Sequence, residues 1–290
     1  MRTSEGLDDQ RAGGILTRSR RPEGMIASLL YQLNHAPLWR REITVWDRRM
    51  RAASLDRLLA LGLHRLGWMG RDEAILLRKL VRPGMQVVDV GANIGLYSLL
   101  FARLVEQNGF VLAFEPEPNL FAILRENCTN NNITNVAPFQ CALGQANGLA
   151  SFHRSAFNSG DNRLENSSMG HDAVEVKVER FDDLQPESRP DFVKIDVQGH
   201  ELGALSGMER ALSANPQVQV LFEFFPAGLR RAGTAPESLL SFFRERGFEL
   251  YETEGARLKR SRNVRELDSA LRGSRYTNLL AARGTIETDD

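Results

Sequence analysis

The sequence predicts an α/β fold in which helices cover both faces of an open, mostly parallel sheet. The apolar segment Val87–Val90 runs into a glycine turn, and a helix-like segment follows it directly. Strand-like and helix-like segments alternate from Met85 onward, and such alternation produces a parallel sheet buried on both faces. Ligands of open α/β sheets bind outside the carboxyl ends of the strands. Four acidic residues fall at or near such ends: Asp89, Glu115, Asp196 and Glu223.

The composition fits one α/β domain with an extension better than two equal domains. The chain has 290 residues, of which 42% are apolar and 26% charged, as in ordinary globular proteins. No apolar run approaches the ~18–20 residues of a membrane span. The polar, arginine-rich segment Met1–Arg21 lacks the apolar stretch of a signal peptide. The two cysteines, Cys128 and Cys141, indicate neither a disulfide framework nor a zinc site. We therefore expect a cytoplasmic protein without a membrane span.

The charge is balanced overall but unevenly distributed along the chain. Residues 1–82 carry 16 basic and 9 acidic residues, whereas residues 83–290 carry 21 and 28. This asymmetry could favour an anionic substrate or partner, but a solvated, arginine-rich helical face is the preferred interpretation. Because surface aromatic residues are not interleaved with the basic ones, no nucleic-acid partner is expected.

The first part of the chain is expected to form a tail and a helical extension. Residues 1–24 are polar and without periodicity, which predicts a disordered tail. Residues 25–82 are assigned to a helical N-terminal extension, because apolar residues have helical spacing in Met25–Leu33 and Ile43–Leu66, and Asp72–Leu80 reads as a further helix. This extension could cap the cofactor cleft, form a homodimer contact or pack on the sheet edge. The three tryptophans in or beside it are interpreted as packing residues: Trp39, Trp46 and Trp68.

Residues 83–285 are expected to form the cofactor-binding domain, around a seven-stranded sheet. Its helices are predicted at Ile94–Glu106, Asn119–Asn130, Leu202–Leu212 and Glu237–Arg246, and the basic segment Arg257–Arg265 is predicted to be an exposed connection. The predicted strands are Gln86–Val90, Phe110–Glu115, Val136–Cys141, Asp191–Asp196, Gln217–Phe224, Phe248–Glu252 and Tyr276–Ala281.

A β insertion is predicted before the fourth strand. Ala150–Arg154 and Ala173–Arg180 read as strands, because valines alternate with charged residues in the second of them. Between them lies a loop too polar for a core, and polar loops near a cofactor cleft often contact substrate. Asn158, Asp161 and Arg163 are therefore candidate substrate contacts, although a plain hairpin connection is the alternative.

The glycine turn favours a cationic ligand. Its spacing, Asp-x-Gly-x-x-x-Gly from Asp89 to Gly95, differs from the Gly-x-Gly-x-x-Gly of dinucleotide-binding folds. An acid there would repel a pyrophosphate, which argues against a nicotinamide dehydrogenase. S-adenosylmethionine carries an ammonium and a sulfonium, and its carboxylate could lie at the following helix N-terminus. Gly91 and Gly95 are expected to leave room for this ligand, with Ala92 and Asn93 between them in contact with it.

One unit further along the chain, a second acid supports the same ligand. Glu115 follows a strand-like segment and can accept hydrogen bonds from both ribose hydroxyls, with Pro116 beside it. Leu143 lies in the loop after the third strand, which borders the adenine in folds of this class. These residues complete the predicted cofactor site.

The chain from about Trp68 to Leu250 resembles the FkbM-type methyltransferases. The match rests on the segments 88–95, 114–116, 159–163, 194–201 and 221–223, of which Lys-Ile-Asp-Val-x-Gly-x-Glu at 194–201 is the most specific. The resemblance implies a class I methyltransferase Rossmann-like fold, S-adenosylmethionine as cofactor, and methylation of a hydroxyl group on a small molecule. The alternatives are an N- or carboxyl-directed methyltransferase of the same fold and a catalytically inactive cofactor-binding protein.

The candidate catalytic residues lie in that most specific segment. An alcohol is a poor nucleophile until a base takes its proton, and Asp196 at the end of the fourth strand is the first candidate. His200 is the second, because its near-neutral pKa suits a base. Asp196 could instead bind the methionine ammonium or cap the following helix. Lys194 shares a strand face with Asp196 and could assist catalysis, bind an anionic substrate or form a structural ion pair.

A metal is not expected, because no cluster of ligands is visible locally in the sequence. Asp161, Asp196 and Glu223 could nevertheless converge on Mg²⁺, which prefers oxygen ligands and would favour ionisation of the acceptor. Glu223 is otherwise a candidate substrate contact. The expected partner is a small-molecule acceptor, whose identity the sequence does not reveal.

Overall fold

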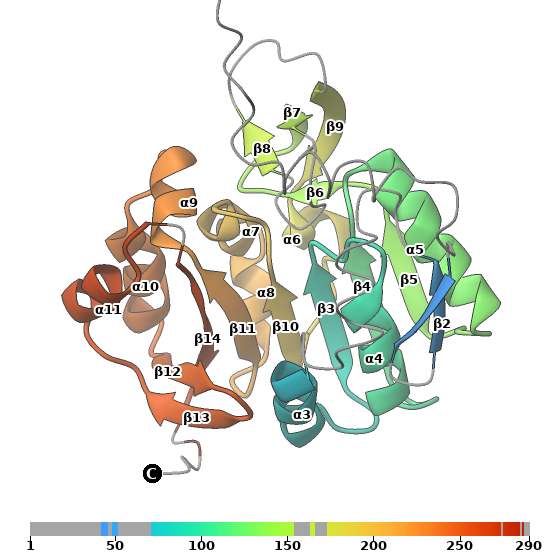
Figure 1. Cartoon of the computed structure of the whole chain (residues 1–290), viewed down its shortest axis with the longest axis horizontal. Coiled ribbons are helices and arrows are strands. Elements are labelled where there is room, and N and C mark those ends of the chain that lie inside the picture. The colour runs from blue at the N-terminus through green and yellow to red at the C-terminus, as the bar shows by residue number, and fades with distance from the viewer. Residues whose placement is uncertain are drawn as a thin grey trace, which may run out of the picture.

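The computed structural model of the chain describes residues 42–45, 48–51, 71–153, 163–165, 173–273, 275–284 and 286. Within these residues the main sheet has eight strands in the order β13-β12-β14-β11-β10-β3-β4-β5 (Figure 1). Helices cover both of its faces, and a smaller sheet lies beyond one end of its central strands. The predicted α/β class with a mostly parallel sheet is confirmed.

Five neighbouring strands of the main sheet are parallel. The order reverses between β3 and β10, because the chain first adds β4 and β5 on one side of β3 and then crosses to the other. A crevice outside the carboxyl ends of the strands is expected at such a reversal. The parallel strands are β3 (Gln86–Val90), β4 (Phe110–Phe114), β5 (Val136–Phe139), β10 (Phe192–Ile195) and β11 (Gln219–Phe224).

The other edge of the sheet is antiparallel and has one strand more than predicted. β14 (Thr277–Ala282) lies between β11 and β12 (Glu249–Glu254) and is antiparallel to both. The segment predicted as an exposed connection contains an eighth strand, β13 (Arg257–Arg260), which pairs with β12. Its central Leu258 is buried between exposed basic residues, so a strand can be half-buried there despite its charge.

Apolar residues alternate along the central strands and pack against helices on both faces. Val87 and Val111 face α3 and α4, and Val88 and Leu112 belong to the core formed with α7, α8 and α10. The predicted helix Leu202–Leu212 is divided in two at Gly207, where a Cβ would overlap the carbonyl oxygen of Gly144. The helices are α3 (Arg71–Leu80), α4 (Leu96–Leu104), α5 (Pro118–Asn130), α6 (Phe181–Leu184), α7 (Glu201–Ser206), α8 (Glu209–Ala214), α9 (Pro226–Arg231), α10 (Pro236–Glu245) and α11 (Val264–Ala270).

The predicted β insertion forms a separate four-stranded sheet in the order β6-β9-β7-β8. Figure 1 shows it above the end of the main sheet at which β3, β4 and β10 finish. It therefore stands over the crevice expected from the strand order. Its strands are β6 (Ala142–Leu143), β7 (Gly148–His153), β8 (Arg163–Glu165) and β9 (Ala173–Glu179).

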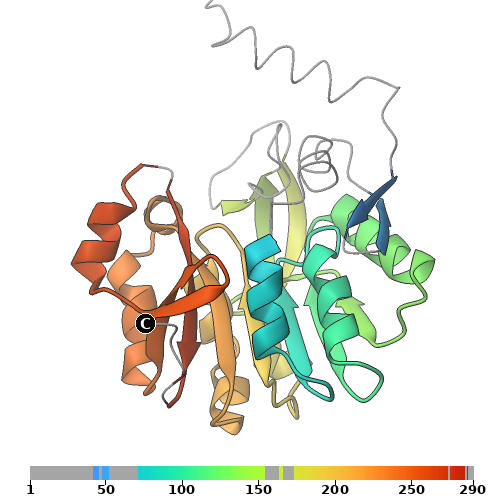
Figure 2. The same ribbon diagram turned by 60° about the horizontal axis from the view of Figure 1, so that its bottom comes forward.

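Part of the N-terminal extension is a hairpin rather than the predicted helix. β1 (Glu42–Val45) and β2 (Arg48–Arg51) pair antiparallel within the segment Ile43–Leu66 that was expected to be helical. Figure 2 shows the hairpin beside α5. Met50 is buried in a cluster with α4 and α5 residues while Arg49 is exposed, so alternate burial overrides the helical spacing of the sequence.

Several predictions for the N-terminal region lie outside the described residues. They include the tail 1–24, the helix Met25–Leu33, the three tryptophans and most of the proposed dimer contact. The predicted helix Asp72–Leu80 is present as α3. None of the helices in the described part of the chain is long and apolar enough to span a membrane.

Candidate active site

The glycine turn after β3 has a left-handed backbone at both of its glycines. The φ angle is +82° at Gly91 and +89° at Gly95, a region in which side chains are strained. The N–H groups of Gly91 and Ala92 both donate to the carbonyl oxygen of Phe114, at 3.0 and 2.9 Å. The turn is therefore tied to the carboxyl end of the neighbouring strand β4.

Both glycines pack closely against other parts of the chain. A Cβ added at Gly91 would overlap the carbonyl oxygen of Asp196, and one added at Gly95 would lie 2.5 Å from Cδ1 of Leu124 on α5. Glycine is thus required by the packing of the turn against other parts of the chain. The room for a cofactor beside the turn, and the contact of these residues with it, stay predictions.

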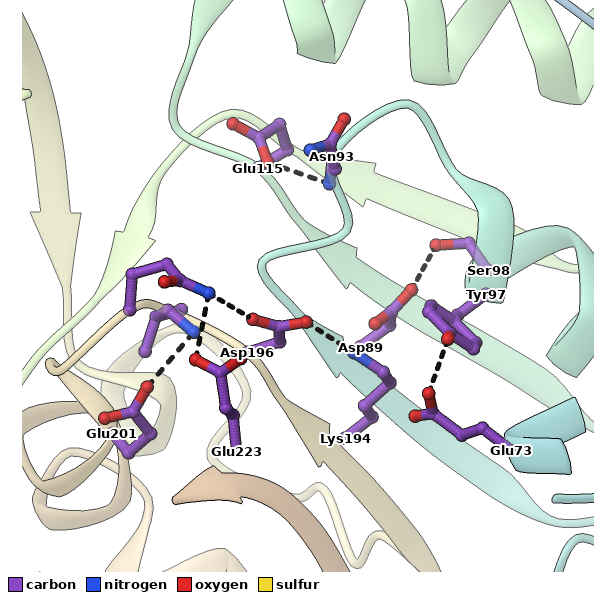
Figure 3. Close-up of polar contacts among 12 residues, drawn as sticks. Glu73, Asp89, Asn93, Tyr97, Ser98, Glu115, Lys194, Asp196, Glu201 and Glu223 are labelled. Carbon is purple, nitrogen blue, oxygen red and sulfur yellow. Dashed lines mark hydrogen bonds and ion pairs between the residues drawn. The ribbon is translucent and has the colours of Figure 1, made fainter. Parts of the chain in front are cut away.

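Glu115 follows β4 and is hydrogen-bonded to the glycine turn at Asn93 (Figure 3). Its Oε2 accepts a hydrogen bond of 2.8 Å from the N–H of Asn93, whose φ is +52°, and its Oε1 accepts one of 2.8 Å from the N–H of Glu117. Burial raises the pKa of Glu115 to about 8, although these two N–H groups oppose the shift. No cation among the described residues forms an ion pair with this carboxylate.

Asp89 lies deeper than its place before the turn suggested. It is the penultimate residue of β3, is only 1% exposed, and its Oδ2 accepts a hydrogen bond of 2.6 Å from the Ser98 hydroxyl on α4. Its Oδ1 is buried and accepts no hydrogen bond from the described residues. Burial raises the pKa of Asp89, and the charge of Lys194 on the adjacent strand opposes the shift. Asp89 therefore retains one oxygen able to accept a hydrogen bond.

Lys194 is the centre of a buried charge network on the same face of the sheet. Its Nζ lies 3.2 Å from Oδ2 of Asp196 and 4.4 Å from the centre of the Tyr97 ring. The Tyr97 hydroxyl donates in turn to Oε2 of Glu73 on α3, at 2.6 Å. Burial lowers the pKa of Lys194, but the carboxylates of Asp196, Glu73 and Asp89 outweigh burial and raise it. Lys194 is thus a buried, charged ion-pair partner.

Asp196 is the point at which this network reaches the surface. Its side chain is 39% exposed, compared with 6% for Lys194. The side-chain amide of Gln198 donates to Oδ1 of Asp196 at 3.2 Å and to Oε2 of Glu223 at 2.9 Å, as Figure 3 shows. The structure therefore brings two predicted site acids, Asp196 and Glu223, to opposite sides of one amide.

Glu201 holds the backbone of the turn that carries Asp196. It is fully buried, and its Oε1 accepts from the N–H groups of Gly199 at 3.0 Å and Val197 at 3.4 Å. Burial raises its pKa to about 7 despite these bonds. His200, the other candidate base, is half-buried at the N-cap of α7. Glu201 therefore constrains the residues between both candidate bases.

Asn127 joins the N-terminal hairpin to the glycine turn. This fully buried residue of α5 donates from Nδ2 to the carbonyl oxygens of Ile94 at 2.8 Å and Arg51 at 3.1 Å. Its Oδ1 accepts from the N–H of Arg51 at 2.6 Å. Met50, the preceding residue, packs in the cluster that contains Ala92. The hairpin is therefore an integral support of the turn.

The remaining predicted site residues are less well placed or lie outside the described residues. Leu143 is buried in the main core cluster, and the predicted adenine contact stays a prediction. Pro116 is half-buried between Glu115 and α5. Arg163 begins β8, and Asn158 and Asp161 are outside the described residues. The predicted substrate contacts of this loop stay predictions.

The described residues contain no group of three His, Cys, Asp or Glu side chains that could hold a metal ion. Asp196 and Glu223 do lie near one another, but the amide that donates to both occupies the position between them. Because Asp161 is outside the described residues, the proposed Mg²⁺ set of Asp161, Asp196 and Glu223 is not tested.

Sequence reasoning missed five residues that build the site. Gln198 and Glu201 lie within the most specific motif, and that position was the signal that could have revealed them. Glu73, Tyr97 and Asn127 come from three different helices, and their spacing in the sequence carries no signal. They reach the candidate site only because α3, α4 and α5 share one face of the sheet.

Residues 89–250 match the family model described as the methyltransferase FkbM domain. Methyltransferase 1 of Beauveria bassiana is 29% identical over 145 residues, which are 42% of this chain and 58% of that protein. The hexuronic acid methyltransferase AglP of Haloferax volcanii is 32% identical over 151 residues, and the match covers 50% of this chain and 59% of that protein. The 31-O-demethyl-FK506 methyltransferase FkbM of Streptomyces tacrolimicus is 31% identical over 163 residues, and the match covers 45% of this chain and 62% of that protein. The chain thus spans about three fifths of the length of these relatives.

The burial of Glu115 predicts a dependence of stability on pH. Its pKa rises from 4.5 to about 8 on folding, so the protonated form is favoured in the folded state. The protonated Glu115 costs the folded state nothing below pH 4.5, the pKa in the unfolded chain. As the pH rises from there toward the folded pKa of about 8, the free energy of unfolding falls, because the unfolded chain loses this proton more readily. Glu115→Gln should therefore gain stability relative to the unchanged chain between pH 5 and 8, by on the order of a few kcal/mol. Urea unfolding across this range measures the difference, and parallel pH profiles would contradict the prediction.

The Asn127 clamp predicts that the hairpin influences ligand binding at the turn. Asn127→Ala should reduce the free energy of unfolding by about 1–3 kcal/mol, because buried backbone groups lose partners. It should weaken S-adenosylhomocysteine binding about tenfold, which is ~1.4 kcal/mol. Isothermal titration measures the affinity.

Asn131→Ala is the matched control, because Asn131 donates to the Arg49 carbonyl of the same hairpin at 2.7 Å and to the Asn127 carbonyl at 2.8 Å, and has no hydrogen bond to the glycine turn among the described residues. Its affinity for S-adenosylhomocysteine should stay unchanged. Equal loss of affinity in both variants would show that Asn127 has no specific effect on the turn.

Proposed function

The chain belongs to the FkbM methyltransferase family, and from this premise we propose that it transfers a methyl group from S-adenosylmethionine to a hydroxyl group of a small molecule. The observation that carries the proposal is a pair of buried carboxylates, Asp89 and Glu115, on the adjacent strand ends beside the glycine turn. Neither is neutralised by a cation at hydrogen-bond distance among the described residues.

The carboxylate oxygens of Asp89 and Glu115 fit the hydrogen-bond donors of S-adenosylmethionine. Oδ1 of Asp89 lacks a hydrogen-bond partner, and each oxygen of Glu115 accepts one N–H and has a further lone pair. Buried acceptors of this kind match ligand donors such as ribose hydroxyls and an ammonium. Glu115 would hold the ribose, and Asp89 would favour the positively charged end. When bound, S-adenosylmethionine supplies a methyl group activated by sulfonium.

The residues around Asp196 suit proton removal from an alcohol. The Asp196 side chain is 39% exposed, and its carboxylate is fixed from two sides by Lys194 and Gln198. A fixed, accessible carboxylate can accept the hydroxyl proton while the oxygen forms its new bond to carbon. Glu201 maintains the backbone that presents it. We assign Asp196 as the base and leave His200 as the second candidate.

The names of the relatives support oxygen as the acceptor atom and a small molecule as the acceptor. One relative is named for a demethylated oxygen of FK506 and another for a hexuronic acid. The second name keeps one alternative open, because the carboxylate of a uronic acid is already ionised and would need no base. Methylation at nitrogen and a binding-only protein have no comparable support.

The donor assignment is tested by ligand-dependent melting of the full chain. S-adenosylhomocysteine should raise the melting temperature, because it binds the folded state alone, and NAD should leave it unchanged. A mass-spectrometric screen with S-adenosylmethionine and a panel of sugars and polyols should then detect a product 14 Da heavier, the mass that replacing H by CH₃ adds. Stabilisation by NAD but not by S-adenosylhomocysteine would reject the proposed donor.

The role of Asp196 is tested once an acceptor is identified. Asp196→Asn should reduce kcat by at least ~10²-fold, the usual contribution of a general base. The affinity for S-adenosylhomocysteine should remain within a few-fold, which controls for misfolding. Unchanged turnover on an alcohol would rule out Asp196 as the base, and His200→Gln would then be the variant to measure.

A further inference from the structure

A hollow lies between α9, α10 and α11. It has a volume of about 370 Å³, and charged side chains form much of its lining. Arg230 comes from α9, Glu237 from α10, and Arg265 and Asp268 from α11, while Arg272 follows α11. None of these residues belongs to the cofactor site or the charge network described above.

The hollow lies toward the carboxyl ends of the parallel strands, as the candidate active site does. Thr277, the first residue of β14, pairs with Phe224, the last residue of β11, so the segment after α11 returns to the carboxyl end of β11. Figure 1 shows α9 and α11 together on that side of the molecule. Ala227 lines the hollow, and the next residue, Gly228, packs its carbonyl oxygen against Gly199. One helix of ~10 Å diameter therefore separates the hollow from the turn that carries Asp196.

The charges of the hollow favour an anion. Three arginines face two acids, and Arg230 is already paired with Asp268 at 2.5 Å. Arg265 and Arg272 are exposed, and neither forms an ion pair or hydrogen bond with any residue of the described chain. Two guanidinium groups are thus available at one small concave surface. Arginine binds carboxylates and phosphates with two parallel hydrogen bonds, which also fixes their orientation.

We propose that this hollow binds the anionic group of a small molecule, a carboxylate or a phosphate ester, through Arg265 and Arg272. The site is distinct from the proposed methyl-transfer centre, because α9 lies between the hollow and the turn that carries Asp196.

The test measures binding of three related sugars to the full chain saturated with S-adenosylhomocysteine. D-glucuronate carries a carboxylate, glucose 6-phosphate carries a phosphate ester, and D-glucose is the neutral match. Titration at low ionic strength should show saturable binding of at least one anionic sugar, at least tenfold tighter than glucose. The anion that binds identifies which of the two groups the hollow accepts.

Three variants locate the binding. Arg265→Gln and Arg272→Gln should each weaken binding of the anionic sugar about tenfold, and the double variant should abolish the preference over glucose. Arg257→Gln is the control, because Arg257 is equally exposed but lies on the edge strand β13. Its affinity should be unchanged.

Two results would overturn the inference. The first is equal binding of all three sugars, and the second is an anionic preference that survives in the double variant. Affinity for S-adenosylhomocysteine is measured in the same preparations and separates the two proposals. If S-adenosylhomocysteine binds and the anionic sugars do not, the anion site is rejected while the methyltransferase assignment stands. If S-adenosylhomocysteine does not bind, the proposed function itself fails.

Discussion

The architecture of the site depends on the close approach of two turns. Gly91, after β3, lies so near the carbonyl oxygen of Asp196, after β10, that residue 91 has no room for a side chain. The contact occurs where the strand order reverses, and it joins the predicted cofactor half of the site to the half that carries the candidate base. Gly91 also has a left-handed backbone, which other residues rarely adopt, so both the space and the conformation require glycine there.

A second constraint is the excess of buried negative charge. Three carboxylates, those of Glu73, Asp89 and Asp196, influence the single ammonium of Lys194, and Glu115 and Glu201 are buried without a cation. Isolated buried carboxylates destabilise a fold unless hydrogen bonds or protonation offset the loss of hydration. Backbone N–H groups provide part of that compensation at Glu115 and Glu201. Such an arrangement is expected where a protein binds a cationic, hydroxyl-bearing ligand rather than where it only stabilises itself.

Local patterns predicted the central sheet well and the surroundings less well. The apolar runs of β3, β4, β10 and β11 are buried on both faces, so each is recognisable without knowledge of its neighbours. The hairpin β1–β2 was mistaken for helix because its burial is set by contact with α5, which the segment does not encode. Lys194 was weighed as a catalytic residue, an anion-binding residue or a structural ion pair, and the packing of α3 and α4 shows that it is buried beside Asp196.

By itself the sequence determined the α/β class, the place of the glycine turn, the inserted β strands and the acids Asp89, Glu115, Asp196 and Glu223, because each depends on neighbouring residues in one strand or turn. Only the tertiary structure decided which groups those acids meet. Glu73, Tyr97, Asn127 and the arginines of the hollow come from separate helices or their ends, and their distances in space bear no relation to their spacing along the chain. The physical reason is that side-chain contacts across a folded core are set by packing of whole elements, whereas strands and turns are specified by local periodicity and backbone preference.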